Sequence, residues 1–307
     1  MNHNKSKELP LNTGQQENGF LRNAFNILLC FILSGSACPG YTKNNVHSKT
    51  HTISLGSGEW PPYEGFKLPE YGLSNYWVRK AFDSQSISID FHFLPWKKSM
   101  SFATDDRLNG TLVWTKTTQR EKDFYFSSPV LKQKTVFFHS HHKKLVWNSL
   151  TDLRGLRIGI TKGYVYHPQL DQLIKDDLSD KNNSRKKFFS LINENPGDDM
   201  SLRQLASGKI DIWPVEVPVA KSLIKKFLTK KESELITWNP KPIKENTYHL
   251  ILNKRNQRNA EFMEAFEKGF KNLKDRVGEE VITEPCSASD RSKLSEVEKN
   301  LYKELCP

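Results

Sequence analysis

The chain has 307 residues, a hydrophobic fraction of 36% and a formal net charge of +11 at pH 7. Its mean hydropathy of −0.64 excludes a polytopic membrane protein, which would need repeated apolar runs of about 20 residues. The length is sufficient for two domains, each with a core of its own. Basic residues occur in short runs between apolar positions, which is typical of solvated faces, so we expect no nucleic-acid partner.

The amino-terminal residues 1–37 have the layout of a secretory signal. Basic residues precede an apolar run from Ala24 to Leu33, and small residues follow it. The run is too short to span a bilayer as a stable anchor. The sequence therefore predicts export to the periplasm and a polar linker over residues 38–51. Two interpretations of Cys38 stay open, a lipid anchor and an unmodified side chain, because Gly35 stands where a lipobox prefers leucine.

The first predicted elements alternate between strand and helix. A β-rich segment at 52–55 ends in a proline-rich loop that carries Trp60 and Tyr63. Apolar residues then recur at helical spacing over 73–81, alternate over 87–93 and predict another helix over 96–103. Sites in α/β domains lie at the carboxyl ends of strands, so Trp60 and Tyr63 are candidate ligand contacts. Ordinary packing of a proline-rich turn is the alternative.

A threonine-rich stretch places an arginine after a run of hydroxyls. Arg120 presents a planar fork of donors that matches a carboxylate, and Thr115 and Thr117 can add hydroxyl donors. This pattern favours a site for a small anion. The alternative is a solvated turn in which Arg120 pairs with Glu121 or Asp123.

The second half of the chain continues the alternation. A β-rich run over 130–140 suits a crossover between two domains, because it is longer than a typical strand of about 5 to 6 residues. The patterns predict strands over 156–160, 186–191 and 235–238, helices over 200–206 and 260–274, and a second crossover over 246–252. The histidines between 139 and 144 lack a carboxylate or cysteine to complete a ligand set, so we expect no metal and no cofactor.

Two places in this half are candidate ligand contacts. Gly163 and Tyr164 follow a predicted strand and open a helical segment, whose free backbone N–H groups favour an anion. Glu216 stands where a strand passes into a helix and offers a carboxylate to a cation. The alternative for Glu216 is an exposed side chain at a helix start, stabilised by the helix dipole.

The cysteines of the carboxyl-terminal region form a natural pair. Cys286 and Cys306 lie close together in the sequence, whereas Cys30 falls within the predicted signal. In an oxidising compartment we expect a disulfide between Cys286 and Cys306 that pins the last helix. Two free thiols in a mobile tail are the alternative.

Two stretches resemble a known family. Thr117 and Arg120, followed by F-S-S-P at 126–129, are similar to the T-P-E-R-x-x-x-x-x-F-S-x-P segment of bacterial family 3 solute-binding proteins. These are the periplasmic receptors of polar amino acid ABC transporters. The stretch 205–220 resembles that family's L-x-x-G-x-x-D-A-x-x-x-D-x-x-x-A. The resemblance covers about residues 52–278 and implies an α/β, two-lobed periplasmic-binding-protein fold of type II with two crossover strands.

The resemblance also implies the lobe boundaries. The first lobe comprises residues 52–140 and the return 247–307, which adds a C-terminal helical tail, and the second lobe comprises residues 141–246.

The family's arginine clamps the α-carboxylate of an amino acid, and the last aspartate of the second stretch binds its α-ammonium. Arg120 and Glu216 occupy these positions. Tyr63 falls at an aromatic residue that stacks on the ligand, and Tyr164 replaces a threonine of the carboxylate cradle. The implied ligand-binding residues are Trp60, Tyr63, Thr115, Thr117, Arg120, Gly163, Tyr164 and Glu216.

The implied function is that of a monomeric periplasmic protein. It would capture a small polar solute, an amino acid or related carboxylate, between its lobes for uptake by an ABC permease. An alternative is a dehydratase-like enzyme on the same fold, with Glu216 or Glu59 as general acid. A nucleic-acid or membrane-surface binder rests on charge alone. The motifs H-E-x-x-H, G-x-S-x-G and the P-loop do not occur, so we expect no enzyme.

Overall fold

The computed structural model describes residues 51–180 and 186–306. The predicted signal and Cys38 lie outside the described residues. The strands within the described part are β1 (His51–Ser57), β2 (Ile87–Phe93), β3 (Gly110–Trp114), β4 (Phe124–Ser140), β5 (Arg157–Thr161), β6 (Leu191–Asn195), β7 (Ile212–Glu216), β8 (Ile236–Trp238) and β9 (Lys244–Asn253).

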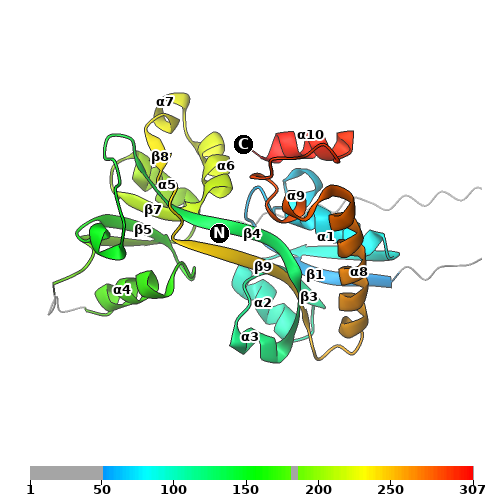
Figure 1. Cartoon of the computed structure of the whole chain (residues 1–307). Helices are drawn as coiled ribbons and strands as arrows, with labels where there is room; N and C mark the ends of the chain where they lie inside the picture. The colour runs from blue at the N-terminus through cyan, green and yellow to red at the C-terminus, as the bar shows by residue number, and fades with distance from the viewer. Residues whose placement is uncertain (1–50, 181–185, 307) are drawn as a thin grey trace, which may run out of the picture. The chain divides into compact units, whose positions relative to one another are not determined.

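The helices are distributed between the strands (Figure 1). The α-helices of the described part are α1 (Leu73–Asp83), α2 (Trp96–Thr104), α3 (Thr118–Asp123), α4 (Pro168–Ser179), α5 (Asp198–Ala206), α6 (Val217–Phe227), α7 (Lys230–Ser233), α8 (Asn259–Val277), α9 (Glu279–Thr283) and α10 (Glu296–Leu305). Two short 3-10 helices are η1 (Pro69–Tyr71) and η2 (Leu150–Leu153). None of the helices in the described ranges is long and apolar enough to cross a bilayer.

The strands form one path in the order β2-β1-β3-β9-β4-β7-β5-β6, with β8 paired to β4. The parallel strands fall into two groups, which we call the first strand group (β1, β2, β3) and the second strand group (β5, β6, β7). The antiparallel strands β4 and β9 pair with each other and connect the two groups (Figure 1). The two extended segments that the sequence assigned to crossovers therefore lie within β4 and β9.

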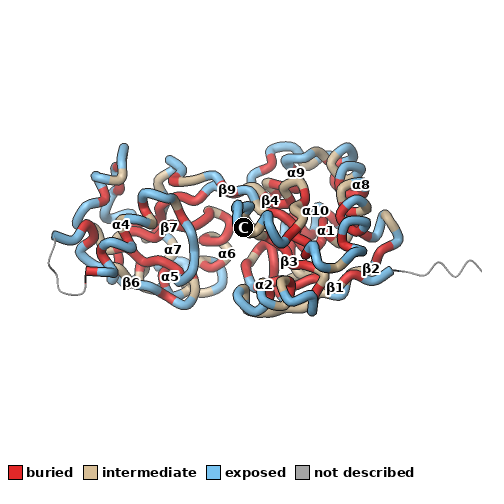
Figure 2. The backbone as a smooth tube through the Cα atoms, turned by 90° about the horizontal axis from the view of Figure 1, so that it is seen from below, coloured by how far each residue is buried: buried red, intermediate tan, exposed pale blue. Residues whose placement is uncertain are grey.

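The largest apolar core contains residues of both strand groups, among them Leu55 of β1 and Trp213 of β7. Strands β3 and β7 are buried along nearly their whole length, as the red segments of Figure 2 show. Helix α8 buries the aromatic face that its spacing predicted, and Phe266 packs on Phe82 of α1 with ring centroids 5.3 Å apart. The second group has a separate core around Ile158, Leu170 and Phe189.

One predicted strand is misplaced. The sequence assigned a strand to 186–191, but β6 begins at Leu191 and its residues are mostly polar. Phe188 and Phe189 are buried in a loop instead, because their backbone N–H groups donate to the Asp177 carboxylate at 2.9 and 2.7 Å. A single carboxylate thus accepts from two backbone N–H groups that would otherwise need the carbonyl groups of a neighbouring strand.

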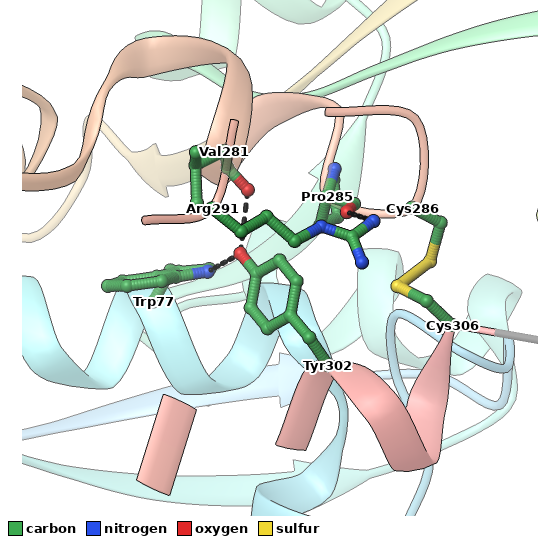
Figure 3. The surroundings of a disulfide bond; sticks show 7 residues. All are labelled: Trp77, Val281, Pro285, Cys286, Arg291, Tyr302 and Cys306. Carbon is green, nitrogen blue, oxygen red and sulfur yellow. Dashed lines mark hydrogen bonds between the residues drawn. A yellow bond between two sulfur atoms is a disulfide. The ribbon is translucent and has the colours of Figure 1, made fainter. Parts of the chain in front are cut away.

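The carboxyl-terminal tail packs on α1 through a network around Tyr302 (Figure 3). The Tyr302 hydroxyl accepts a hydrogen bond from Trp77 Nε1 at 2.8 Å and donates one to the Val281 carbonyl at 2.6 Å. Cys286 and Cys306 form a disulfide at the end of α10. The tail is therefore tied to the rest of the fold covalently and by buried polar contacts.

We expect the Cys286→Ser/Cys306→Ser protein to be about 3 kcal/mol less stable than the oxidised wild type, because the bridge restricts the unfolded chain over a separation of 20 residues. Denaturant unfolding measures the difference, and alkylation of the unreduced wild type should label neither cysteine. Reductant should weaken the wild type to the level of the variant and leave the variant unchanged. Alkylation of both thiols before reduction would contradict this expectation.

Candidate functional site

The predicted site residues collect at the carboxyl ends of parallel strands. Trp60 and Tyr63 follow β1, and Thr115, Thr117 and Arg120 follow β3. Gly163 and Tyr164 follow β5, and Glu216 ends β7. Because parallel strands present these ends at the same edge of a sheet, each strand group contributes one set of candidate residues to its own edge.

Arg120 is held by its own loop rather than by an acidic neighbour. Its Nη1 donates to the carbonyl and to the Oγ1 of Thr115 at 2.8 and 2.9 Å, and the Thr117 hydroxyl accepts from its backbone N–H at 3.2 Å. Glu121 pairs with Lys116 instead, at 2.9 Å. No carboxylate lies within ion-pair distance of Arg120 in the described ranges, so the guanidinium retains donors for a ligand.

The surroundings of Arg120 are aromatic. Its guanidinium lies over the Trp114 ring, 4.8 Å from the ring centroid, and Trp114 contacts Trp96 edge-on at 5.9 Å. Partial burial lowers the pKa of Arg120 below its usual value. A Cβ at Gly58 would collide with the Trp96 ring, so the aromatic stack reaches the loop that follows β1.

Trp60 and Tyr63, the two aromatic candidates after β1, are both buried. Tyr63 has no exposed surface and Trp60 keeps 6%. Their rings lie 5.2 Å apart, and Trp60 contacts Tyr248 of β9 at the same distance. The Tyr63 hydroxyl and the Trp60 indole N–H nevertheless have no hydrogen-bond partner among residues 51–180 and 186–306. Packing alone does not account for two orphaned polar atoms.

Glu216 is buried rather than exposed, which excludes the solvated helix start that the sequence left open. It keeps 6% of its surface and accepts a hydrogen bond from the Thr135 hydroxyl of β4 at 2.9 Å. Burial, together with the charge of Asp198, raises the pKa of Glu216 to about 7. Tyr63, Tyr164 and Tyr248 all lie close enough to Glu216 for its charge to raise their pKa values.

The turn after β5 gives Gly163 a backbone that other residues rarely adopt, with φ at +85°. No atom lies near the place where its Cβ would be, so the positive φ is the reason for glycine here. Tyr164 keeps 36% of its surface exposed, but its hydroxyl end is desolvated beside Asp198 and Glu216, and its pKa is raised well above the usual value.

The structure brings some predicted residues together and keeps others apart. Trp60, Tyr63, Tyr164 and Glu216 share one neighbourhood through their ring contacts and mutual charge effects. Thr115, Thr117 and Arg120 form a separate group. No hydrogen bond, ion pair or ring contact between residues of the described part joins the two groups directly, although both border the loop after β1.

Sequence reasoning missed three residues of this neighbourhood. Asp198 begins α5 and accepts from the Thr161 hydroxyl at 2.6 Å. Tyr248 comes from β9. Glu64 is fully buried, and burial raises its pKa to about 8. An acidic residue at a helix start is common, so the sequence held no signal that set Asp198 apart.

A hollow of about 480 Å³ opens beside the same turn but does not contain the charged centre of the site. Gly163 and Tyr164 line it together with Asp171 and Lys175 of α4. Neither Arg120 nor Glu216 reaches it. No group of three acidic, histidine or cysteine side chains suited to a metal ion occurs in the portion of the chain that the structure covers.

The pKa of Glu216 predicts a pH effect on stability. The unfolded chain ionises Glu216 near 4.5 and the folded protein near 7. Between these values the folded protein keeps a proton that the unfolded chain has lost, so stability falls as pH rises through this window and is level above it. In the wild type, the free energy of unfolding should fall by an amount on the order of 3 kcal/mol between pH 4.5 and 7 because of Glu216. We expect Glu216→Gln to lack this fall.

Denaturant unfolding of wild type and Glu216→Gln at a series of pH values measures this effect. The shared contributions of other groups cancel in the difference between the two proteins. A difference that stays constant from pH 4 to 8 would contradict the raised pKa.

Comparisons with known proteins agree with this arrangement of strands and helices. No protein-family model and no curated protein matches the chain. Solved structures match it along most of their own length. The GluR0 ligand-binding core from Nostoc punctiforme in complex with L-glutamate is 16% identical, with a TM-score of 0.58, and the match covers 83% of this chain and all of that one.

Two further structures share the fold at similar distance. Substrate-binding domain 2 of GlnP from Lactococcus lactis, in an open conformation, is 18% identical over 74% of this chain and 91% of that one, with a TM-score of 0.52. A histidine kinase sensor domain with similarity to periplasmic binding proteins is 18% identical over 74% and 92%, with a TM-score of 0.56. The chain has the two-lobed fold of periplasmic binding proteins.

This periplasmic-binding-protein fold confirms the fold class expected from the sequence. The resemblance that rested on the Arg120 and Glu216 stretches is confirmed at the level of the fold. The structures matched are binding proteins and ligand-binding domains. In the periplasmic-binding-protein fold of this chain, the strand ends that carry Arg120 and Glu216 belong to different strand groups.

Proposed function

We propose that this protein captures a small polar solute, an amino acid or related carboxylate, between its two lobes. The observation that carries the proposal is a pair of opposite charges on opposite strand groups. Arg120 has donors and no carboxylate partner in the described chain, and Glu216 is a buried carboxylate. The guanidinium would clamp the solute's carboxylate, and Glu216 would accept its ammonium group.

Binding would then favour a closed arrangement of the lobes. A zwitterion that contacts Arg120 and Glu216 at once gains interactions that are lost when the lobes separate. We assign residues 52–140 and 247–307 to the first lobe and 141–246 to the second, with β4 and β9 as the connections. Trp60, Tyr63, Thr115, Thr117, Gly163 and Tyr164 complete the proposed contacts.

The cellular role follows from the same proposal. The amino-terminal signal would export the protein to the periplasm, where it would work as a monomer and deliver its solute to an ABC permease. Cys38 would be the first mature residue, with or without a lipid anchor. The fold supports solute capture, and the signal pattern supports the compartment.

Thermal-shift screening of the purified mature protein against the standard amino acids and small carboxylates tests the function, followed by calorimetry on each solute that raises the melting temperature. We expect at least one amino acid to bind with a stoichiometry of one per chain. Stabilisation by nucleic acid or lipid vesicles, with none by any amino acid or small carboxylate, would overturn the proposal.

A dehydratase-like activity is the second candidate, and one observation favours it. Glu216 is desolvated and its pKa lies at about 7, which suits a general acid near neutral pH. Turnover of a solute identified by the thermal screen, lost in Glu216→Gln, would favour the enzyme. Stoichiometric binding without product would leave the receptor as the function.

A further inference from the structure

Two buried carboxylates occupy the end of the second strand group. Glu216 keeps 6% of its surface exposed and Asp198 keeps 9%. They are close enough for the charge of Asp198 to raise the pKa of Glu216. Lys244 is the cation that acts on Glu216, and Asp199 adds a further negative charge near Asp198. Burial raises the pKa of both carboxylates, so ionising the pair in the empty site is costly, and a cation bound beside the pair would favour its charged form.

Donors hold both carboxylates in place. Thr161 donates to Asp198 at 2.6 Å, and Tyr164 lies close enough to Asp198 to lower its pKa. Thr135 donates to Glu216 at 2.9 Å. These donors favour the charged form of each carboxylate, whereas burial favours the neutral form and outweighs them while no cation is bound.

Tyrosine side chains surround the pair. The charge of Glu216 acts on Tyr63, Tyr164, Tyr166 and Tyr248, and that of Asp198 acts on the last three. Tyrosine faces attract cations within about 6 Å of the ring centroid, so the walls match the charge of the carboxylates.

One of the atoms without a partner in this neighbourhood is an acceptor as well as a donor. The Tyr63 hydroxyl is fully buried beside Glu216 and makes no hydrogen bond within the described residues. A phenol oxygen can accept a hydrogen bond from an ammonium or guanidinium N–H. A ligand with such a donor would satisfy it.

Asp198 is the first residue of α5, where the helix dipole favours a negative charge, so its role could be structural. That role is served equally by Asp199, the next residue of the same turn, which is less buried. Burial of Asp198 against Thr161, away from water, is not needed for the dipole interaction.

We propose that the solute carries a second cationic group besides its α-ammonium, held by Asp198 beside Glu216 between tyrosine walls, so that the site selects basic amino acids. The inference rests on the proposed function. The solute's carboxylate would then pair with Arg120, its α-ammonium with Glu216 and its second cationic group with Asp198. Each charge of the solute would have an opposite charge on the protein. A neutral side chain would leave Asp198 buried without a counter-charge, which is costly.

Calorimetry with matched ligand pairs tests the selectivity. L-Arginine and L-citrulline have nearly the same shape, but the side chain of citrulline is an uncharged urea. L-Lysine and L-norleucine form a second pair. We expect each cationic member to bind roughly 10-fold or more tightly than its neutral partner, because only the cationic member can form a buried charge pair with Asp198.

Asp198→Asn locates the effect, and Asp199→Asn is the matched control on the same turn. The asparagine keeps an oxygen that can accept from Thr161, so folding should persist, which thermal melting verifies. We expect Asp198→Asn to reduce the preference for L-arginine over L-citrulline by roughly 10-fold and to leave citrulline affinity within about threefold. Asp199→Asn should change neither.

The outcomes separate this inference from the function on which it rests. Equal or tighter binding of the neutral partners, or an unchanged preference in Asp198→Asn, overturns the second cationic subsite and leaves amino acid capture standing. Absence of binding by every amino acid, charged or neutral, overturns both. A preference for the cationic partners that Asp198→Asn removes and Asp199→Asn retains supports the inference.

Discussion

Replacement of Arg120 by lysine should weaken solute binding almost as much as replacement by alanine. A lysine ammonium keeps the charge but cannot reproduce the fork of donors that meets both oxygens of a carboxylate. It would also lose the contact with the Trp114 ring and the bonds to Thr115. The expected cost is about 2 to 5 kcal/mol, or roughly 30-fold to several thousand-fold in affinity, measured by calorimetry on the solute identified by thermal screening.

The control for this change is Arg107→Ala. Arg107 lies in the loop that precedes β3, but its side chain is 53% exposed and pairs with Asp105. Its removal should leave affinity unchanged. Folding of the Arg120 variants should be nearly unaffected, because the guanidinium has no ion-pair partner in the described chain. If Arg120→Ala binds the solute with an affinity within about threefold of the wild type, Arg120 does not clamp the solute's carboxylate.

Replacement of Tyr302 by alanine should destabilise the protein by about 3 to 5 kcal/mol, the usual cost of removing a buried aromatic side chain. Tyr302 is 1% exposed and contacts Trp77 across the junction between α10 and α1. The change leaves a cavity and also removes the partner of Trp77 Nε1 and of the Val281 carbonyl. Denaturant unfolding of the oxidised protein measures the loss.

Tyr302→Phe separates the ring from the hydroxyl. The variant keeps the packing of the ring and leaves the Trp77 indole N–H and the Val281 carbonyl unpaired. We therefore expect it to be about 1 to 3 kcal/mol less stable than the wild type. Solute affinity should be unchanged in both variants, because the tail lies outside the proposed site. Equal stability of Tyr302→Ala and wild type would show that α10 contributes little to the fold.

Much of the architecture could be predicted from periodicity. The aromatic spacing of α8 and the alternation of β2 identified an amphipathic helix and a strand at nearly the observed bounds. The pattern failed at β6, because the apolar pair Phe188 and Phe189 resembles a buried strand locally. Its burial depends on Asp177, a partner in another element, which a local pattern does not contain.

The site was predictable only where a motif carried it. Arg120 and Glu216 stood out because spacing to neighbouring residues marked them. Tyr248 had no such mark, because alternation along a strand does not reveal which face meets Glu216. Glu64 has an ordinary position in a loop, and a local pattern does not show that this loop is fully buried.

The route of the chain through the sheet affects how the protein folds as it is made. Strand β3 pairs with β1 on one side and with β9 on the other, so its second ladder cannot form until Leu252 has been made. The hydrogen bond from Trp77 likewise requires Tyr302. Pairings between such distant segments form slowly. The strands β5, β6 and β7 lie close together in sequence. A nascent chain would therefore hold the β3 edge of the first strand group open until β9 has been made, and this edge needs protection from aggregation during that time.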